Sequence, residues 1–167
     1  ATMPATTLKS AYRQGLWTGA PFFFVAAPVS MLFGVLATEA GLSFVEVMGM
    51  TVIVIAGASQ FTAVQLMTEA APVWLIIAAS LAVNLRMAMY SASLQPHLGA
   101  APLWQRALIA YTNFDQSYAV SIAQYEETPD WPVATKVAYF FGSATIIVPT
   151  WVSFTAVGAL AGAAIPD

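Results

Sequence analysis

Long stretches without a charged side chain are the feature that most constrains the fold of this 167-residue chain. There are 25 uncharged residues between Arg13 and Glu39, and 22 between Glu46 and Glu69. A third run of 30 residues follows Lys136. A helix needs about 20 apolar residues to cross the hydrocarbon core of a bilayer. Each of these runs is therefore long enough to hold a transmembrane helix.

The composition excludes a soluble domain. Charged residues make up 8% of the chain and hydrophobic residues 59%, whereas about 25% of the residues in a soluble domain are charged. A net charge of −3 offers no basic face for nucleic acid. The chain has no cysteine, which excludes disulfides and thiolate chemistry.

Two further spans are predicted, and each of them carries a charge into the membrane. A third helix over residues 72–93 contains Arg86, and a fourth over residues 107–125 contains Asp115. The run after Lys136 is too long for one helix and is expected to fold back near Pro149. We therefore predict an all-α, polytopic integral membrane protein of about six transmembrane helices, some of them broken or kinked.

We predict a single transmembrane domain over residues 1–167. Residues 1–16 form an N-terminal segment, residues 17–94 hold the first three spans, residues 104–167 hold the remaining spans, and a polar linker occupies residues 126–132. The first span reads as a retained helix, not a signal peptide. Lys9, Arg13 and Lys136 fall on one side of six alternating helices, which favours a cytoplasmic N-terminus, although Arg106 falls on the other side.

A short polar sequence interrupts the second predicted span near its centre. It consists of Gly57, Ala58, Ser59 and Gln60. One interpretation is close helix packing, because small residues let backbones approach and Ser or Gln can hydrogen-bond to a neighbour. The other is a local unwinding in which backbone groups and the Gln60 amide line a polar cavity. The sequence leaves both open.

The third predicted helix is polar on two sides. One stripe holds Ser80, Asn84, Ser91 and Gln95, and another holds Arg86, Tyr90, Ser93 and His97. We expect Arg86 to be paired or hydrated, because a charge at the bilayer centre is costly, and Asp115 on the next span is the nearest candidate partner. The pair is either a structural ion pair or a functional site. His97 is expected to lie at an interface or to cap the helix.

Enzyme chemistry finds little support in the sequence. The chain has one His and no Cys. It also has no HExxH motif, no Walker-type loop and no paired intramembrane carboxylates. We therefore expect no catalytic residues, no cofactor and no metal site.

Three motifs, in order, resemble those of the AzlC-type branched-chain amino acid permeases. They are GASQFTAVQL, NLRMAMYSASLQPHL and TNFDQSYA. The opening GAPFFFVAAPVSMLFGVLATEAGLS and the closing VGALAGAAIPD are similar to the same family, so the resemblance covers nearly the whole chain. The family usually has an Asp-Glu pair where this chain has Asp115 and Gln116, and its members continue with further apolar segments beyond Asp167.

The resemblance implies export of branched-chain amino acids, often with a small AzlD-type membrane subunit, in a bacterial inner membrane. We expect a transporter subunit for branched-chain or other small apolar amino acids. The alternative is a non-transporting membrane scaffold. The candidate substrate-binding residues are Gly57, Ser59, Gln60, Asn84, Arg86 and Asp115, with Asp115 and Gln116 as coupling positions and Phe22, Phe23 and Met31 as an apolar wall. A homo-oligomer is a further expectation.

Overall fold

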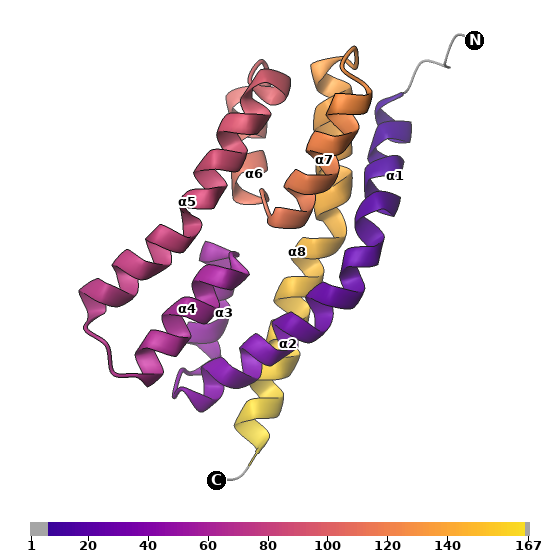
Figure 1. Ribbon diagram of the computed structural model, residues 1–167. Coiled ribbons are helices and arrows are strands. Elements are labelled where there is room, and N and C mark those ends of the chain that lie inside the picture. The colour runs from indigo at the N-terminus through magenta and orange to yellow at the C-terminus, as the bar shows by residue number, and fades with distance from the viewer. Residues whose placement is uncertain (1–6, 166–167) are drawn as a thin grey trace. The chain divides into compact units, whose positions relative to one another are not determined.

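The computed structural model describes residues 7–165, and every regular element in this part of the chain is a helix, with no strand (Figure 1). The elements are α1 (Leu8–Gly19), the 3₁₀ turn η1 (Ala20–Phe22), α2 (Phe23–Glu39), α3 (Phe44–Val54), α4 (Gly57–Thr68), α5 (Val73–Leu98), α6 (Leu103–Tyr111), α7 (Asp115–Glu127) and α8 (Val133–Ala164). The predicted all-α membrane class is confirmed.

Three helical stretches of the described chain are long and apolar enough to cross a bilayer. They are Leu8–Glu39, which joins α1, η1 and α2, then α5, then α8. The prediction of about six spans is not confirmed. The stretches expected as the second and fourth spans each divide into two short helices.

The second expected span is a helical hairpin made of α3 and α4. The Gln60 side chain donates from Nε2 to Thr51 Oγ1 at 3.0 Å, and Val47 and Val64 belong to one buried cluster. In each pair, one residue precedes Ile55–Ala56 by as many positions as the other follows it. Residues that approach each other in this order belong to two helices that run antiparallel. Their 11 and 12 residues measure about 16 to 18 Å. Each arm is therefore too short to cross a hydrocarbon core of about 30 Å.

The reversal between α3 and α4 depends on two residues with non-helical backbone. Ile55 has φ 41° and ψ 41°, the left-handed conformation, which a β-branched side chain rarely adopts. Ala56 follows with φ −132° and ψ 91°. The helix therefore ends at Val54 and a new one begins at Gly57.

The fourth expected span is also a hairpin, formed by α6 and α7. The Tyr90 hydroxyl on α5 donates to Asp115 Oδ1 at 2.8 Å, and the Tyr118 hydroxyl donates to Ser93 Oγ at 3.0 Å. These pairs show that α7 runs parallel to the second half of α5. Since α6 starts at the end of α5 and ends beside Ser91, it runs the opposite way.

The structure divides into two compact units. The first contains residues 7–23 and Met89–Ile147, and the second contains Phe24–Ala88 and residues 148–165. Each unit holds one of the two hairpins. Arg86 belongs to the second unit and Asp115 to the first.

The expected fold-back near Pro149 is wrong, because α8 is a single helix of 32 residues that continues through Pro149. A proline inside a helix removes one backbone donor, and membrane helices tolerate this loss when neighbouring groups compensate. The first expected span is interrupted by η1, which contains Pro21, whereas α2 continues through Pro28. Helix α1 begins at Leu8, inside the segment expected to precede the spans.

Close backbone approach holds the second unit together. A Cβ added at Gly34 on α2 would lie 2.3 Å from the carbonyl oxygen of Thr155 on α8, and one at Gly158 would lie 2.0 Å from the carbonyl oxygen of Met31. Only a residue without a side chain permits this spacing. Small residues at helix contacts are typical of membrane proteins, where packing replaces the hydrophobic drive to associate.

Candidate functional site

The tip of the α3–α4 hairpin carries a buried hydrogen-bond network centred on Gln60, which is 0% exposed. Gln60 donates to Thr51 and accepts from the Trp151 indole Nε1–H at 3.1 Å. The Thr51 hydroxyl in turn donates to the Val47 carbonyl oxygen at 2.8 Å. The amide is thus fixed at both ends and joins α3, α4 and α8.

The other candidate residues of this hairpin lie in the first turn of α4. Its N-cap residue, Ala56, makes no side-chain capping hydrogen bond to the backbone N–H groups that give a helix its positive end. Trp151 covers Gly57 so closely that an added Cβ would lie 2.7 Å from the indole ring. The Ser59 hydroxyl donates to the Ser80 carbonyl oxygen of α5 at 3.1 Å.

These contacts change what the Gly57–Gln60 segment was expected to do. The irregular backbone lies just before it, at Ile55 and Ala56, and Gly57 to Gln60 form a regular first turn. Gln60 is buried, and its amide hydrogen-bonds to Thr51 and Trp151. The polar residues of this segment therefore stabilise the hairpin tip.

The second site lies at the start of α7, where Asp115 is the first helical residue. A carboxylate at this position is favoured by the positive end of the helix. Its donor, Tyr90, stacks on Tyr118 with ring centroids 4.2 Å apart and an interplanar angle of 9°. The tyrosine pair thus connects Asp115 to α5. Gln116 follows as the second residue of α7 and is partly buried.

Asn84 and Arg86 are partly buried on the first half of α5, in the other unit from Asp115. The expected approach of Arg86 to Asp115 therefore stays a prediction.

His97 lies in the last turn of α5, as expected for a residue at a helix end. Its Nδ1 is 3.4 Å from Lys136 Nζ, and the same ammonium donates to the Pro129 carbonyl oxygen at 3.0 Å. Lys136 is buried and also lies 5.7 Å from the centroid of the Tyr125 ring. These contacts join the ends of α5, α7 and α8. No cluster of metal-ligating side chains occurs within residues 7–165.

Sequence reasoning missed three residues that hold these sites. Thr51 and Trp151 complete the Gln60 network, and Tyr90 donates to Asp115. The sequence places Tyr90 only on a polar stripe of the third predicted helix. Nothing in the spacing of Thr51 or Trp151 indicates their contacts, because these contacts exist only after α3 reverses into α4.

Long apolar helices with two helical hairpins and buried polar tips define a polytopic helical membrane protein. Residues 21–165 match the family described as AzlC protein, so the chain belongs to the AzlC family. The chain is thus a membrane protein of a transport-related family.

Two relatives support this assignment. An "Uncharacterized membrane protein" of Archaeoglobus fulgidus is 30% identical over 160 residues, which are 96% of this chain and 67% of the relative. The "Inner membrane protein YgaZ" of Escherichia coli is 25% identical over 156 residues, which are 92% of this chain and 62% of the relative. The chain therefore spans about two thirds of their lengths. No solved structure matches.

Proposed function

We propose that this chain is a transporter subunit, not an enzyme, that exports branched-chain or other small apolar amino acids across a bacterial inner membrane. The proposal rests on membership of the AzlC family and its resemblance to branched-chain amino acid permeases. The structural observation that supports it best is the pair of helical hairpins, α3–α4 and α6–α7, in a chain that also has three helical stretches long and apolar enough to cross a membrane.

Short hairpins favour a transport function because their tips would place non-helical backbone at membrane depth. Non-helical backbone is tolerated at membrane depth only where protein buries it or where it borders a water-filled cavity. Transporters use such discontinuous helices to hold polar substrates and ions near the bilayer midplane. A scaffold that only packs against partner helices has no need of two interrupted helices.

The candidate residues suit a zwitterionic substrate with an apolar side chain. In this proposal Arg86 or the N-terminal turn of α4 holds the carboxylate, Asp115 holds the ammonium, and Phe22, Phe23 and Met31 form an apolar wall. Gln60 has a positioning role, since Thr51 and Trp151 already occupy both ends of its amide. Ser59 and Asn84 complete the polar set.

Coupling to protons is proposed through Asp115, because a carboxylate in a partly dry site can exchange a proton during a transport cycle. Gln116 cannot titrate, so a relay that requires two carboxylates is absent at this position. A small AzlD-type membrane subunit is the proposed partner, and a second copy of the chain is a further one.

Flux through proteoliposomes tests the proposal. The chain is reconstituted with and without a co-expressed small subunit, and the efflux of labelled valine, leucine and methionine is measured against protein-free vesicles. We expect saturable flux that unlabelled leucine inhibits. Absence of flux from both preparations, with folded protein in the membrane, would favour the scaffold.

A further inference from the structure

Two basic side chains, His97 and Lys136, join the last turn of α5 to the start of α8. His97 Nδ1 lies 3.4 Å from Lys136 Nζ, and the same ammonium donates to the Pro129 carbonyl oxygen at 3.0 Å. Lys136 is only 6% exposed, and it forms no ion pair with a carboxylate of residues 7–165. Buried charges are normally paired. A second positive charge at this position would therefore meet no compensating one.

The contact between the two side chains requires a neutral imidazole. A lysine ammonium has only donors, so His97 Nδ1 has to be the acceptor and carry no proton. A protonated ring would offer only donors and would place two positive charges 3.4 Å apart. His97 is the single histidine of the chain, and histidine is the side chain whose charge ordinarily changes between about pH 5 and pH 8.

The end of α5 that carries His97 is suited to move. The 26 residues of α5 measure about 39 Å, which exceeds a hydrocarbon core of about 30 Å. The exposed side chains of Glu126 and Asp130 flank the α7–α8 turn, which Lys136 joins to this end, so it is aqueous. Pro96 has no N–H for the Ala92 carbonyl, and the last turn of α5 therefore depends more on side-chain contacts.

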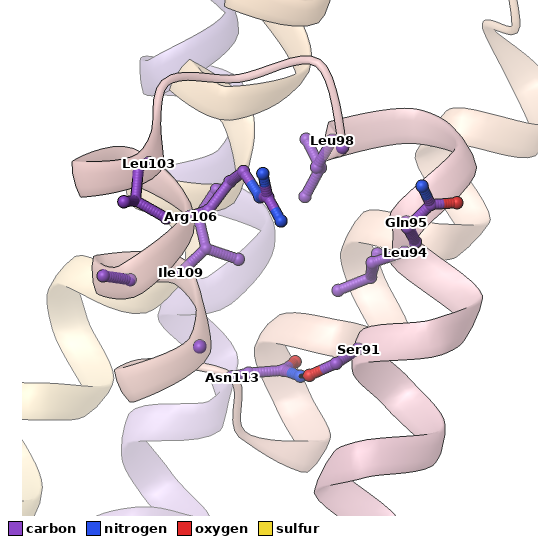
Figure 2. Close-up of a pocket in the computed structure, with 11 residues that line it drawn as sticks. Ser91, Leu94, Gln95, Leu98, Leu103, Arg106, Ile109 and Asn113 are labelled. Atoms are coloured by element: carbon purple, nitrogen blue, oxygen red, sulfur yellow. Dashed lines mark hydrogen bonds between the residues drawn. The ribbon is translucent and has the colours of Figure 1, made fainter.

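His97 also lies beside a cavity of about 340 Å³ between α5 and α6, which we call the α5–α6 cavity (Figure 2). Leu94, one turn before His97, and Leu98, which follows it, line this cavity and point toward α6. Both leucines belong to the buried cluster that contains Tyr125 and Val137. A displacement of the last turn of α5 would therefore move one wall of the cavity and expose these leucines.

The other ionisable groups near His97 come from α7 and α6. The Tyr125 ring has its centroid 5.3 Å from that of the imidazole, and its hydroxyl donates to the Lys136 carbonyl oxygen at 2.6 Å. The Glu126 carboxylate attracts a charged His97, but it is exposed and water screens it. On α6, across the cavity, the charged residue is Arg106. The charge in direct contact with His97 is thus that of Lys136.

We propose that protonation of His97 releases the last turn of α5 from α8 and widens the α5–α6 cavity. The pair is a latch that is closed while His97 is neutral and open once it is charged. Unfolding lets His97 take up a proton that the closed latch excludes. The unfolded chain therefore binds more protons, and stability falls as the pH falls through the range of histidine. The latch does not depend on which substrate the chain transports, so its test needs no flux.

Thermal unfolding in detergent tests the latch. Between about pH 8 and pH 5, the Tm of the wild-type chain should fall about 2 to 4 °C further than that of His97→Gln, whose amide accepts from Lys136 but does not titrate. Lys136→Met removes the cation, so it should lower Tm at neutral pH and show the weaker pH dependence of His97→Gln. Lys9→Met is the matched control, since Lys9 is exposed on α1 and should keep the wild-type pH dependence.

Cysteine reactivity measures the cavity. The chain has no cysteine, and Leu94 on the cavity wall is 2% exposed. Ala100→Cys is the reference, because Ala100 is exposed in the turn after α5 and does not line the cavity. The alkylation rate of Leu94→Cys relative to this reference should rise about fivefold between about pH 8 and pH 5, which is the effect of about one lost hydrogen bond. Adding His97→Gln to both proteins should keep the ratio constant.

Three outcomes would overturn the proposal. Equal changes of Tm with pH in the wild type and His97→Gln would refute the latch. A wild-type pH dependence in Lys136→Met would also refute it, because burial of His97 alone would then explain the effect. A constant ratio of alkylation rates, together with the expected Tm pattern, would show that the pair separates without moving α5, and would refute the widening of the cavity.

Discussion

The indole Nε1–H of Trp151 on α8 donates to the amide oxygen of Gln60 on α4, with a nitrogen–oxygen distance of 3.1 Å. The same amide donates through Nε2 to Thr51 on α3. One buried side chain therefore fixes both arms of the α3–α4 hairpin to a helix that is distant in sequence. The network depends on tertiary structure, because no two of its three members lie on the same helix.

Loss of the Trp151 donor should loosen the hairpin. Trp151→Phe leaves Gln60 Oε1 buried without its donor and is expected to destabilise the protein by about 1 to 3 kcal/mol. Thermal unfolding in detergent measures this as a lower Tm. Trp74→Phe is the control, since Trp74 is 70% exposed and should change Tm little. Equal Tm values for the two variants would show that the bond contributes nothing.

The hairpin predicts that both of its ends lie on the same side of the membrane. The chain has no cysteine, so single substitutions need no altered background. Ser43→Cys and Glu69→Cys should react with a membrane-impermeant maleimide from the same side of oriented vesicles. Ala100→Cys should react from the other side, because the 26 residues of α5 span about 39 Å. Labelling of the first two from opposite sides would mean that residues 44–68 cross the bilayer.

Two glycines in different surroundings should respond oppositely to alanine. Gly34→Ala would place a methyl group 2.3 Å from the Thr155 carbonyl oxygen, so α2 and α8 would have to separate. We expect Gly34→Ala to lower the free energy of unfolding by about 1 to 3 kcal/mol, which is typical of overpacking. A Cβ added at Gly49 would meet no described atom within 4 Å, and Gly49→Ala should raise the free energy of unfolding by about 0.5 to 1 kcal/mol through helix propensity. Unfolding midpoints of both variants check this, and destabilisation by both would contradict it.

The N-terminus of α3 should lose stability in acid. The Ser43 backbone N–H donates to Glu46 Oε2 at 2.7 Å, and this bond, together with the one between the Ser43 side chain and Glu46, lowers the pKa of that carboxyl. A lowered folded-state pKa stabilises the protein above the carboxyl's ordinary pKa, and the contribution disappears as the pH falls through the folded-state value. Glu46→Gln should therefore lower Tm at neutral pH, and this difference should shrink as the pH falls below the carboxyl's ordinary pKa. A Tm difference that does not depend on pH would rule out this ionic contribution.

The helical membrane class follows from the sequence because the lengths of the uncharged runs directly reflect the thickness of a bilayer. The uncharged run between Arg13 and Glu39 predicts a span on that basis. The prediction of α5 needs one more step, because its helix over residues 72–93 has to carry Arg86 into the membrane. The sequence does not predict the reversal at Ile55, because residues 47–68 form an uncharged run of ordinary span length. A left-handed isoleucine followed by an extended alanine gives no compositional signal. Pro149 has the opposite effect on prediction: it suggests a break in the helix, but α8 continues through it.

The site residues also divide into those that the sequence predicts and those that it does not. Gln60 and Asp115 stand out as polar residues in apolar surroundings, and the structure gives each of them specific partners. Their partners are not predictable from spacing along one helix, because Thr51 and Tyr90 meet them only through the two hairpins.

The final prediction concerns proton coupling at Asp115, whose Oδ1 accepts from the Tyr90 hydroxyl at 2.8 Å. If export exchanges substrate for protons, Asp115 is the side chain we expect to carry the proton, because Gln116 beside it cannot titrate. Asp115→Asn should then abolish pH-driven flux while membrane insertion and Tm stay close to wild type, since Asn keeps the size and can still accept from Tyr90. Gln116→Glu should change the pH optimum of flux. Proteoliposome flux under an imposed pH gradient measures both effects.

The competing account makes Asp115 the counter-ion of Arg86, and it predicts a different pattern. Asp115→Asn would then leave the partly buried Arg86 without its carboxylate partner and lower the free energy of unfolding by up to about 3 to 5 kcal/mol. Adding Arg86→Gln to the same protein would restore stability, because the double variant carries no unmatched charge. Tm values for the single and double variants decide between the accounts, since a proton carrier with no structural role leaves Tm unchanged. An Asp115→Asn protein whose flux keeps the wild-type pH dependence rules out the relay, whatever its Tm.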